Sequence, residues 1–272
     1  MTATLSHMIA GPESAARTAY VLHGILGSKS NWRSLSRLFA ARLEGWAFVA
    51  VDLREHGESL GFAPPHTLAA VTDDLARLCA TLGRPPSAVI GHSFGAKCAL
   101  AWMDANPALD RAVILDTNPG ARENGAGSET TLEVLRTLHR VGARFASRDA
   151  FVSALTDAGT ARATAQWLAM NLVAREGGYA FRLDLDAIDA LLADYFARDL
   201  WRVLEAPSPG ARIEFVVGGR STVLSAEDRA RLADLDARHA GLRVTTLPEA
   251  DHWVHVDDPG AVTDAVLRAL GG

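Results

Sequence analysis

The stretch Ala88-Val89-Ile90-Gly91-His92-Ser93-Phe94-Gly95-Ala96-Lys97 decides the fold of this chain. Its apolar beginning predicts a buried strand, and the residues that follow it have the apolar spacing of a helix. The Gly-x-Ser-x-Gly pattern between them is typical of a sharp strand-to-helix turn. Gly91 and Gly95 leave room where strand and helix crowd each other. The Ser93 hydroxyl is then either an ordinary helix N-cap or a group placed where helix N–H groups favour developing negative charge.

The composition indicates a folded, water-soluble chain. Of 272 residues, 49% are hydrophobic and 22% are charged, which suffices for a substantial core. A net charge of −5 favours neither nucleic acid nor an anionic membrane as a partner. The spacing of Cys and His predicts no metal site, and Cys79 and Cys98 are expected to be small buried residues. With no signal-like N-terminus and no apolar run of about 18 residues, we expect a cytoplasmic protein.

Two parts of the chain alternate strands and helices. Near-continuous apolar strands of this kind predict an α/β fold with a mostly parallel sheet covered by helices on both faces. Polar side chains fall near the carboxyl ends of four of these strands, and ligand sites lie at that edge of such sheets. We assign residues 1–118 and 207–272 to this core. The expected apolar strands are 19–22, 47–51, 88–90, 112–115, 213–217 and 243–247, and the polar residues at strand ends are His23, Asp52, Ser93 and Asp116.

The alternation stops between residues 119 and 206. This segment predicts a helical cap inserted into the core, with no clear buried strand. Apolar cap residues, Trp167 and Tyr195 among them, are expected partly to roof the site and mostly to pack the cap against the core. The expected cap helices are 128–143, 147–158, 160–174 and 184–200, with a short extended piece at 179–183.

Local signals set several element boundaries. Asn31 is predicted as the N-cap of a helix reaching Glu44, and Thr67 as the N-cap of one reaching Leu82. Ser225 begins a helix with a pattern similar to a capping box. Residues 2–10 alternate loosely and are expected to form an edge strand.

A serine hydroxyl becomes a useful nucleophile when a neighbouring base removes its proton during attack. Histidine has a suitable pKa, and a buried carboxylate must orient it. His252, in the loop after the last predicted strand, is our candidate base. His255 is its rival, but we expect it to pack beside the start of the last helix.

The acid is less obvious. Asp116 follows the next strand after the helix that begins at Ser93, so its loop should lie beside that of Ser93 and within reach of His252. The other nearby carboxylates have competing explanations. Glu227 and Asp228 begin a helix and are expected to cap it, while Asp251 is adjacent to His252 and should point away from its ring.

An oxyanion formed by attack on a carbonyl needs two backbone N–H donors. We expect one from Phe94, the residue after the nucleophile, and one from Ile25 in the loop His23–Ser28. His23 is expected to hold that loop together rather than to react. The loop 52–59 is expected to be a structural scaffold, with Asp52 supporting the site from behind.

Three stretches carry a family resemblance: His23-Gly24-Ile25-Leu26-Gly27-Ser28, residues 52–59, and Gly91 through Gly95. Together they resemble the α/β-hydrolase superfamily, in which the chain order is Ser, acid, His. The Gly218-Gly219-Arg220-Ser221 loop, Asp116 and the run 252–255 resemble the small YbfF-type esterases in particular. That resemblance implies a triad acid moved to the earlier strand, at Asp116. Ser221 stands where many relatives have Asp and is a candidate hydrogen-bond partner near the acid.

The prediction is a serine hydrolase that cleaves carboxylic esters through Ser93, His252 and Asp116 and an acyl-enzyme, without a cofactor. Its partner would be a small-molecule acyl substrate. The same groups also suit an amidase, a thioesterase, a C–C bond hydrolase or a perhydrolase. A receptor that uses the hydrolase fold only to bind a ligand is the non-enzymatic alternative. Acyl length and oligomeric state do not follow from the sequence.

Overall fold

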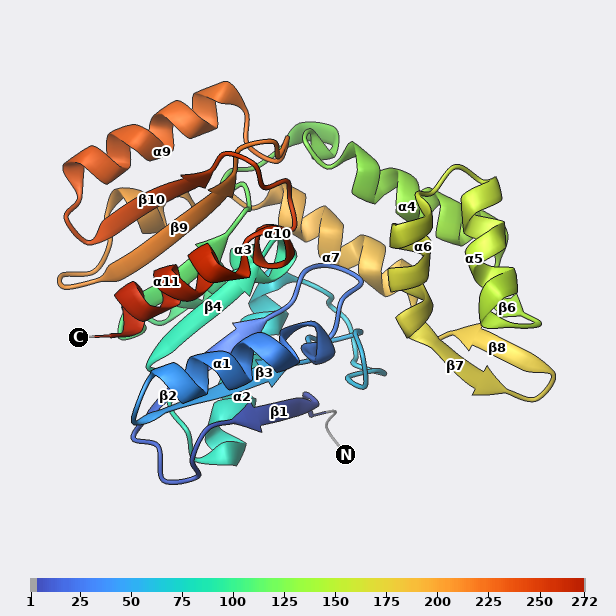
Figure 1. Ribbon diagram of the computed structural model, residues 1–272, viewed down its shortest axis with the longest axis horizontal. Coiled ribbons are helices and arrows are strands. Elements are labelled where there is room, and N and C mark those ends of the chain that lie inside the picture. Colours follow the sequence, from blue (N-terminus) through green and yellow to red (C-terminus); the bar gives the residue numbers. More distant parts are fainter. Residues whose placement is uncertain (1–3, 272) are drawn as a thin grey trace.

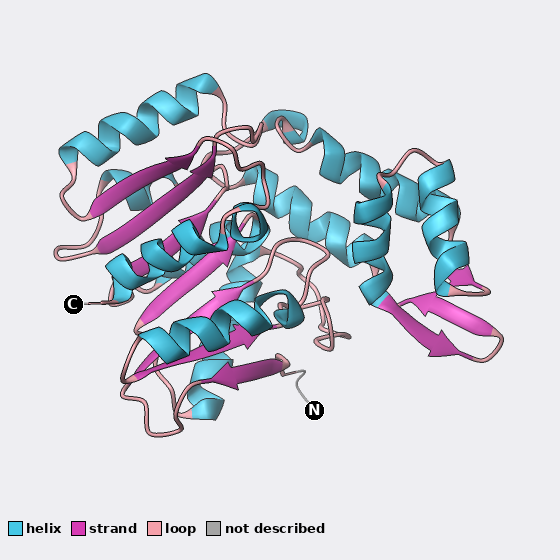
Figure 2. Cartoon of the chain, in the orientation of Figure 1, coloured by secondary structure: helices cyan, strands magenta, loops and turns pink. Residues whose placement is uncertain are grey.

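A seven-stranded sheet forms the centre of the molecule in the computed structural model, which describes residues 4–271 (Figures 1 and 2). The strand order is β1-β3-β2-β4-β5-β9-β10. All neighbours pair in parallel except the edge strand β1, which is antiparallel to β3. The α/β fold class is confirmed. The strands are β1 (His7–Ala10), β2 (Arg17–Leu22), β3 (Trp46–Val51), β4 (Ala88–His92), β5 (Arg111–Leu115), β9 (Arg212–Gly218) and β10 (Leu242–Leu247).

Helices cover both faces of this sheet, which explains why its central strands are apolar along most of their length. Every residue of β3 and β4 is buried. The helices α1 and α11 pack on one face, in front of the sheet in Figure 1, while α2, α3 and α9 pack on the other. The core helices are α1 (Arg33–Arg42), α2 (Leu68–Leu82), α3 (Phe94–Ala105), α8 (Trp201–Glu205), α9 (Ala226–Arg238), α10 (Val254–Asp257) and α11 (Pro259–Leu270), with the 3-10 turn η1 (Lys29–Trp32) before α1.

Between β5 and α8 the chain forms the cap, which projects to one side of the sheet (Figure 1). It contains four α-helices, but also a small three-stranded sheet of order β6-β8-β7. The predicted domain boundaries at 118/119 and 206/207 stay predictions. Just inside the second boundary, α8 packs against α3 of the core. The cap elements are η2 (Glu123–Gly125), α4 (Glu129–Val141), β6 (Arg144–Phe145), α5 (Arg148–Asp157), α6 (Arg162–Leu168), η3 (Ala169–Asn171), β7 (Leu172–Arg175), β8 (Gly178–Phe181) and α7 (Leu185–Ala197).

The prediction of one helix over 160–174 is therefore wrong in its second half. The helix ends at Leu168, and residues 172–175 pair with 178–181 as an antiparallel hairpin. Gly177, with φ +78°, supplies a left-handed backbone at the second central position of the turn between β7 and β8, which glycine adopts readily. The ladder of the hairpin satisfies backbone groups that a longer helix would otherwise have paired internally.

The predicted helix starts have mixed outcomes. Thr67 accepts a hydrogen bond from the Ala70 N–H as the N-cap of α2, and Ser225 caps α9 in a capping box. Asn31 is not an N-cap. It lies inside η1, where its Oδ1 accepts the Ser28 N–H at 2.8 Å. Of the predicted edge strand 2–10, the structure forms His7–Ala10, while residues 2 and 3 lie outside the described residues.

Over the described range, the helices are too short or too polar to cross a lipid bilayer.

Candidate active site

The elbow between β4 and α3 has the strained geometry that its sequence predicts. Ser93 has φ +54° and ψ −117°, in a region that residues other than glycine rarely adopt. A side chain on Gly91 would collide with the backbone of Gly95 and Ala96. A side chain on Gly95 would collide with the carbonyl oxygens of Leu22 and His23. The two glycines therefore let the turn close while Ser93 stays at its tip.

The structure brings the three predicted side chains together. The Ser93 Oγ lies 3.0 Å from the His252 Nε2, and the His252 Nδ1 lies 2.8 Å from the Asp116 Oδ2. A carboxylate only accepts hydrogen bonds, so Nδ1 carries a hydrogen and Nε2 presents its lone pair to the Ser93 hydroxyl. This tautomer is the one that general-base activation of a serine requires.

Asp116 is completely buried and has three hydrogen-bond donors. The Gly218 N–H donates to its Oδ1 at 2.9 Å, and the Ser221 hydroxyl donates to its Oδ2 at 2.5 Å. The third donor is the His252 ring, on the same Oδ2. Asp116 also has a left-handed backbone, with φ +42°. Ser221 therefore contacts the carboxylate itself, in the loop where the superfamily pattern often has Asp.

The alternative acids lie elsewhere. The Asp228 carboxylate accepts the Ser225 N–H at 3.0 Å and the Asn118 side-chain amide at 2.8 Å, so it caps α9 and fastens a neighbouring loop. The Asp251 carboxylate accepts the backbone N–H of His252 at 2.7 Å and does not bond to its ring. Glu227 is in the first turn of α9.

Two further histidines, His92 and His255, lie beside the His252 loop, and a role for His92 does not follow from the sequence. His92 is buried, and its Nε2–H donates to the His252 carbonyl at 2.8 Å. Burial lowers its pKa well below the usual range, and the neighbouring His255 and His252 lower it further. The only signal for this role in the sequence is the position of His92 next to Ser93.

The rival base His255 packs where we expected, beside the last helices. Its ring stacks on Trp32 with 4.7 Å between ring centroids, and lies 4.5 Å from the ring of His92. Burial, and then the nearby His252, lower the pKa of His255 to about 4. Within the described residues 4–271, the Ser93 hydroxyl is hydrogen-bonded to His252 and not to His255.

The predicted oxyanion donors flank Ser93. Ile25 lines the same pocket as Ser93, and Phe94 is the first residue of α3, where the N–H groups have no partner inside the helix. The His23 Nε2 accepts the Leu53 N–H at 3.0 Å, so its Nδ1–H donates to the Gly24 carbonyl at 2.8 Å. His23 therefore holds the loop, as expected, and burial lowers its pKa.

The loop 52–59 is built around Asp52. Its carboxylate accepts the Lys29 N–H at 2.6 Å, the Lys29 ammonium at 2.7 Å and the Glu58 N–H at 2.9 Å. A side chain on Gly57, which has φ +55°, would collide with the same carboxylate. Asp52 thus supports the loop and has no hydrogen bond to the other predicted site residues within the described chain.

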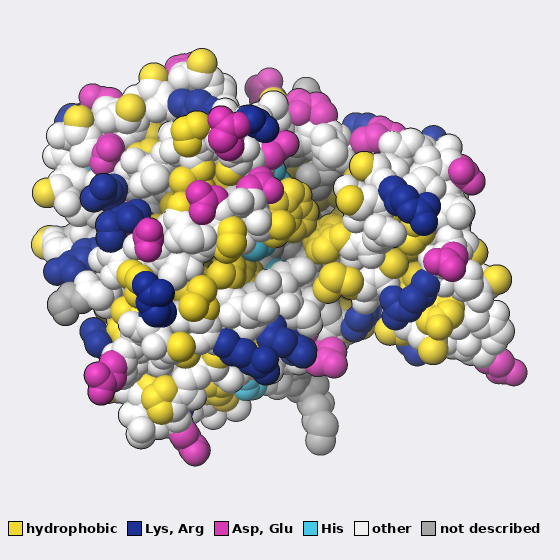
Figure 3. All heavy atoms as spheres, in the orientation of Figure 1, with side chains coloured by type: hydrophobic (Ala, Val, Ile, Leu, Met, Phe, Trp, Pro, Cys, Tyr) yellow, Lys and Arg dark blue, Asp and Glu magenta, His cyan; other side chains and the backbone are white. Residues whose placement is uncertain are grey.

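A pocket of about 390 Å³ opens over Ser93 and His252. One wall comes from the core and cap together, where the rings of Trp253 and Trp167 meet edge to face with centroids 4.9 Å apart. Another wall is the start of α4, residues 127–131, which contributes hydroxyl groups. Figure 3 shows hydrophobic side chains gathered in the hollow between core and cap. The pocket volume of about 390 Å³ is at the lower end of the range for small-molecule sites.

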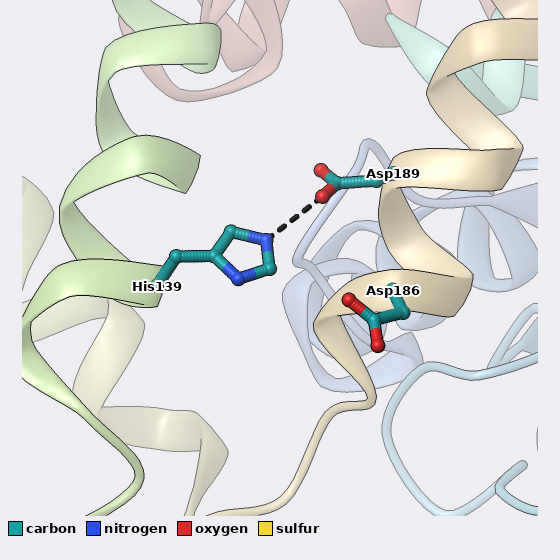
Figure 4. Close-up of side chains that lie close together, drawn as sticks. All are labelled: His139, Asp186 and Asp189. Carbon is teal, nitrogen blue, oxygen red and sulfur yellow. Dashed lines mark hydrogen bonds and ion pairs between the residues drawn. The ribbon is translucent and has the colours of Figure 1, made fainter.

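A separate group lies on the cap surface. His139 of α4 faces Asp189 of α7 at 2.8 Å, with Asp186 beside it (Figure 4). The ligand atoms of these three residues lie within 4.8 Å of one another, and all three side chains are exposed. None of the three lines the pocket over Ser93. The hydrogen bond between His139 and Asp189 links α4 to α7. Exposed pairs of this kind contribute little to stability.

Known proteins resemble the chain over nearly its whole length. Residues 19–265 match the sequence model described as the alpha/beta hydrolase family. The chain is similar to the sn-1-specific diacylglycerol lipase ABHD11 of Mus musculus, with 29% identity over 273 residues, which cover 98% of this chain and 85% of the relative. The same lipase of Danio rerio is 27% identical over 257 residues, which cover 92% of this chain and 77% of the relative.

Solved structures agree with this result. A marine microorganism esterase has a TM-score of 0.85 at 20% identity, covering 99% of this chain and 100% of that chain. An E-2-(acetamidomethylene)succinate hydrolase has a TM-score of 0.78 at 20% identity, covering 98% and 95%. At this level of identity the likeness establishes a shared fold.

Proposed function

The chain belongs to the alpha/beta hydrolase family, and we propose that it is a serine hydrolase that cleaves carboxylic esters through Ser93, His252 and Asp116. Ser93 is the nucleophile, His252 the general base and acid, and Asp116 the group that orients the imidazole. The N–H groups of Ile25 and Phe94 form the oxyanion hole. The substrate is a small acyl compound, and the reaction uses no cofactor.

The reaction proceeds in two halves. As the Ser93 oxygen bonds to the ester carbonyl carbon, its proton passes to the His252 Nε2, and the carbonyl oxygen takes up the negative charge. His252 then gives the proton to the leaving alkoxide, which departs as the alcohol and leaves an acyl-enzyme. In the second half water attacks the acyl carbon, His252 takes its proton, and the carboxylic acid leaves as Ser93 regains its hydrogen.

The observation that carries this proposal is the continuous hydrogen-bonded path from Ser93 to Asp116. Its two links are 3.0 Å and 2.8 Å long, and they join residues 159 and 136 positions apart in the sequence. Three donors fix the buried Asp116 carboxylate in place, where it can stabilise the imidazolium that forms on His252. The names of the Mus musculus and Danio rerio relatives point to acylglycerols as one class of ester to test.

The experiment compares the purified wild type with Ser93→Ala on p-nitrophenyl esters of increasing acyl length and on a diacylglycerol. We expect turnover by the wild type and loss of about a million-fold in kcat for the variant, since the nucleophile acts as a unit with its base. A fluorophosphonate should label the wild type and leave the variant unlabelled. Equal turnover by the two proteins, or an unlabelled wild type, would contradict the proposal and favour a ligand receptor.

A further inference from the structure

The oxyanion loop contains a backbone conformation that its own sequence does not favour. The Gly27 N–H donates to the Gly24 carbonyl at 3.0 Å, which closes a tight turn with Ile25 and Leu26 at its centre. Leu26 has φ +62°, in the left-handed region. Leucine enters this region only at a cost in free energy, because its Cβ crowds the following carbonyl. A strained backbone conformation of this kind is kept only when contacts with the surrounding structure stabilise it.

Asn171 holds it from the cap. Its side chain is buried, and its Nδ2 donates to the Leu26 carbonyl at 2.9 Å. The two residues are 145 positions apart, so the bond joins the cap to the loop that contains Ile25. Without this donor the Leu26 carbonyl would be buried and unsatisfied, which destabilises the conformation of the loop.

Asn171 is itself fixed by its neighbours. Its backbone carbonyl accepts the Arg182 N–H at 2.9 Å, which fastens the end of η3 to the chain leaving β8. Arg148 of α5 donates to the Ala169 carbonyl at 2.6 Å and to the Leu172 carbonyl at 3.2 Å. The amide of Asn171 therefore projects from a braced corner of the cap and can fix the position of a core loop.

We propose that Asn171 is a positioning residue of the oxyanion hole: through the Leu26 carbonyl it holds the turn that directs the Ile25 N–H toward the substrate. The cap is then part of the catalytic machinery as well as a roof over the pocket. This inference rests on the proposed function, because it assigns a role to a loop that matters only if an oxyanion forms at Ser93.

The first test replaces Asn171 by Leu, which keeps its size without the donor, and by Ala as a second variant in case Leu does not fold. Each should lower kcat by about ten- to a hundredfold, less than the loss of a whole oxyanion donor. KM should stay within about twofold, because the substrate's ground state needs the oxyanion hole little. The inhibition constant of a boronic acid that forms a tetrahedral adduct with Ser93 should rise in the same proportion.

A matched control separates positioning from general loosening of the cap. Asp194 of α7 accepts the Leu68 N–H at 2.8 Å, a bond between cap and core that does not involve the corner at Asn171. Asp194→Ala should therefore leave kcat within about threefold of the wild type, because this partly buried bond does not reach the oxyanion loop. An equal loss of kcat in Asp194→Ala and the Asn171 variants would overturn the positioning role.

Glycine at position 26 provides a rescue test. Glycine adopts the left-handed conformation without the cost that leucine bears. Combined with Asn171→Ala, Leu26→Gly should therefore reduce kcat less than the product of the two single effects. Multiplicative losses, or Asn171 variants with unchanged kcat, contradict the inference while leaving esterase activity intact. A wild type that neither cleaves esters nor takes the fluorophosphonate removes the proposed function and this inference with it.

Discussion

Three residues near the pocket share left-handed backbone: Ser93 at the elbow, Asp116 after β5 and Leu26 in the oxyanion loop. None of them is glycine, so each stores strain that its surroundings must hold. Ser93 is held by the close packing of Gly91 and Gly95, and Asp116 by the donors around its carboxylate. The strain falls on the groups whose direction matters for the proposed reaction.

At this scale, Asp116→Asn tests the choice of acid. An amide at this position favours the wrong tautomer of His252, which would present a hydrogen instead of a lone pair to Ser93. We expect kcat to fall by about ten-thousand-fold. Steady-state kinetics on a p-nitrophenyl ester measures it.

Asp228→Asn is the matched control, because that carboxylate caps α9 and makes no bond to His252. Its activity should stay within about twofold of the wild type, with only a modest loss of stability from the weakened cap. Full activity of Asp116→Asn together with a large loss of activity in Asp228→Asn would show that Asp228, at the start of α9, is the acid.

The residues of the predicted path could be found from the sequence because each follows a recognisable strand and bears a reactive group. Asn171 could not. An amide in a cap segment has no distinctive spacing, and its partner is a backbone carbonyl 145 residues away. His92 lies within the Gly-x-Ser-x-Gly motif, but its bond to the His252 carbonyl depends on how a loop 160 residues away returns to the sheet.

At the scale of elements, α3 contains an unusual charge. Lys97 is one turn beyond Ser93 and fully buried. Its ammonium donates to the Gly120 carbonyl at 2.7 Å and lies 4.6 Å from the centre of the Tyr195 ring. Gly120 is on the chain entering the cap and Tyr195 on α7, so this side chain joins the helix that follows Ser93 to both ends of the cap.

Burial, and then the nearby Arg122, lower the pKa of Lys97 to about 7 from its ordinary value of 10.5. Between these two values the unfolded chain binds a proton that the folded chain lacks, so the free energy of unfolding rises with pH. Below pH 7 both states are protonated and this slope disappears. Lys97→Met should remove the rise, which is on the order of a few kcal/mol across the interval.

Urea unfolding of wild type and Lys97→Met at pH 7 and pH 9.5 measures this difference. Lys29→Met is the comparison, since Lys29 is the other lysine and its ammonium is paired with Asp52 and Glu58. Burial opposes the charge there, but the two carboxylates raise the pKa of Lys29, so no rise over this interval is expected from it. Equal slopes in the wild type and Lys97→Met would show that Lys97 is not the source.

Elements of the core could be predicted because their strands are continuous apolar runs and the N-caps of their helices are local signals, as at Thr67. The cap sheet could not, because β6 has two residues and β7 and β8 four each. Strands this short carry too few positions to show alternation. Pairing, rather than propensity, decides their structure.

At the scale of the whole molecule, the order of strands follows from the alternation of apolar runs and helices, but the docking of cap on core does not. The contacts that set it, such as those of Asn171 and Lys97, join single polar side chains to backbone carbonyls. The apolar pattern of the cap sequence is compatible with more than one way of docking the cap on the core. The pocket wall at which Trp167 meets Trp253 therefore depends on information that a single sequence does not display.

The whole fold also encloses several neutral histidines, and this makes it sensitive to acid. Burial lowers the pKa of His56 to about 3 and that of His255 to about 4, and it lowers the pKa of His23 and His92 as well. Between these values and the ordinary 6.5, the unfolded chain binds protons that the folded chain excludes. The free energy of unfolding should therefore fall as the pH drops below about 6.5, by up to about 1.4 kcal/mol per pH unit for each such histidine.

Replacing one of them tests this account. His255→Gln should lose some stability at pH 7, because the stack on Trp32 is lost, but its free energy of unfolding should fall less steeply than the wild type's between pH 6.5 and pH 4.5. His139→Gln, at an exposed position on the cap, should keep the wild-type slope. Chemical unfolding at four pH values resolves the slopes. If His255→Gln and the wild type lose stability in parallel, the acid sensitivity has its source in other groups.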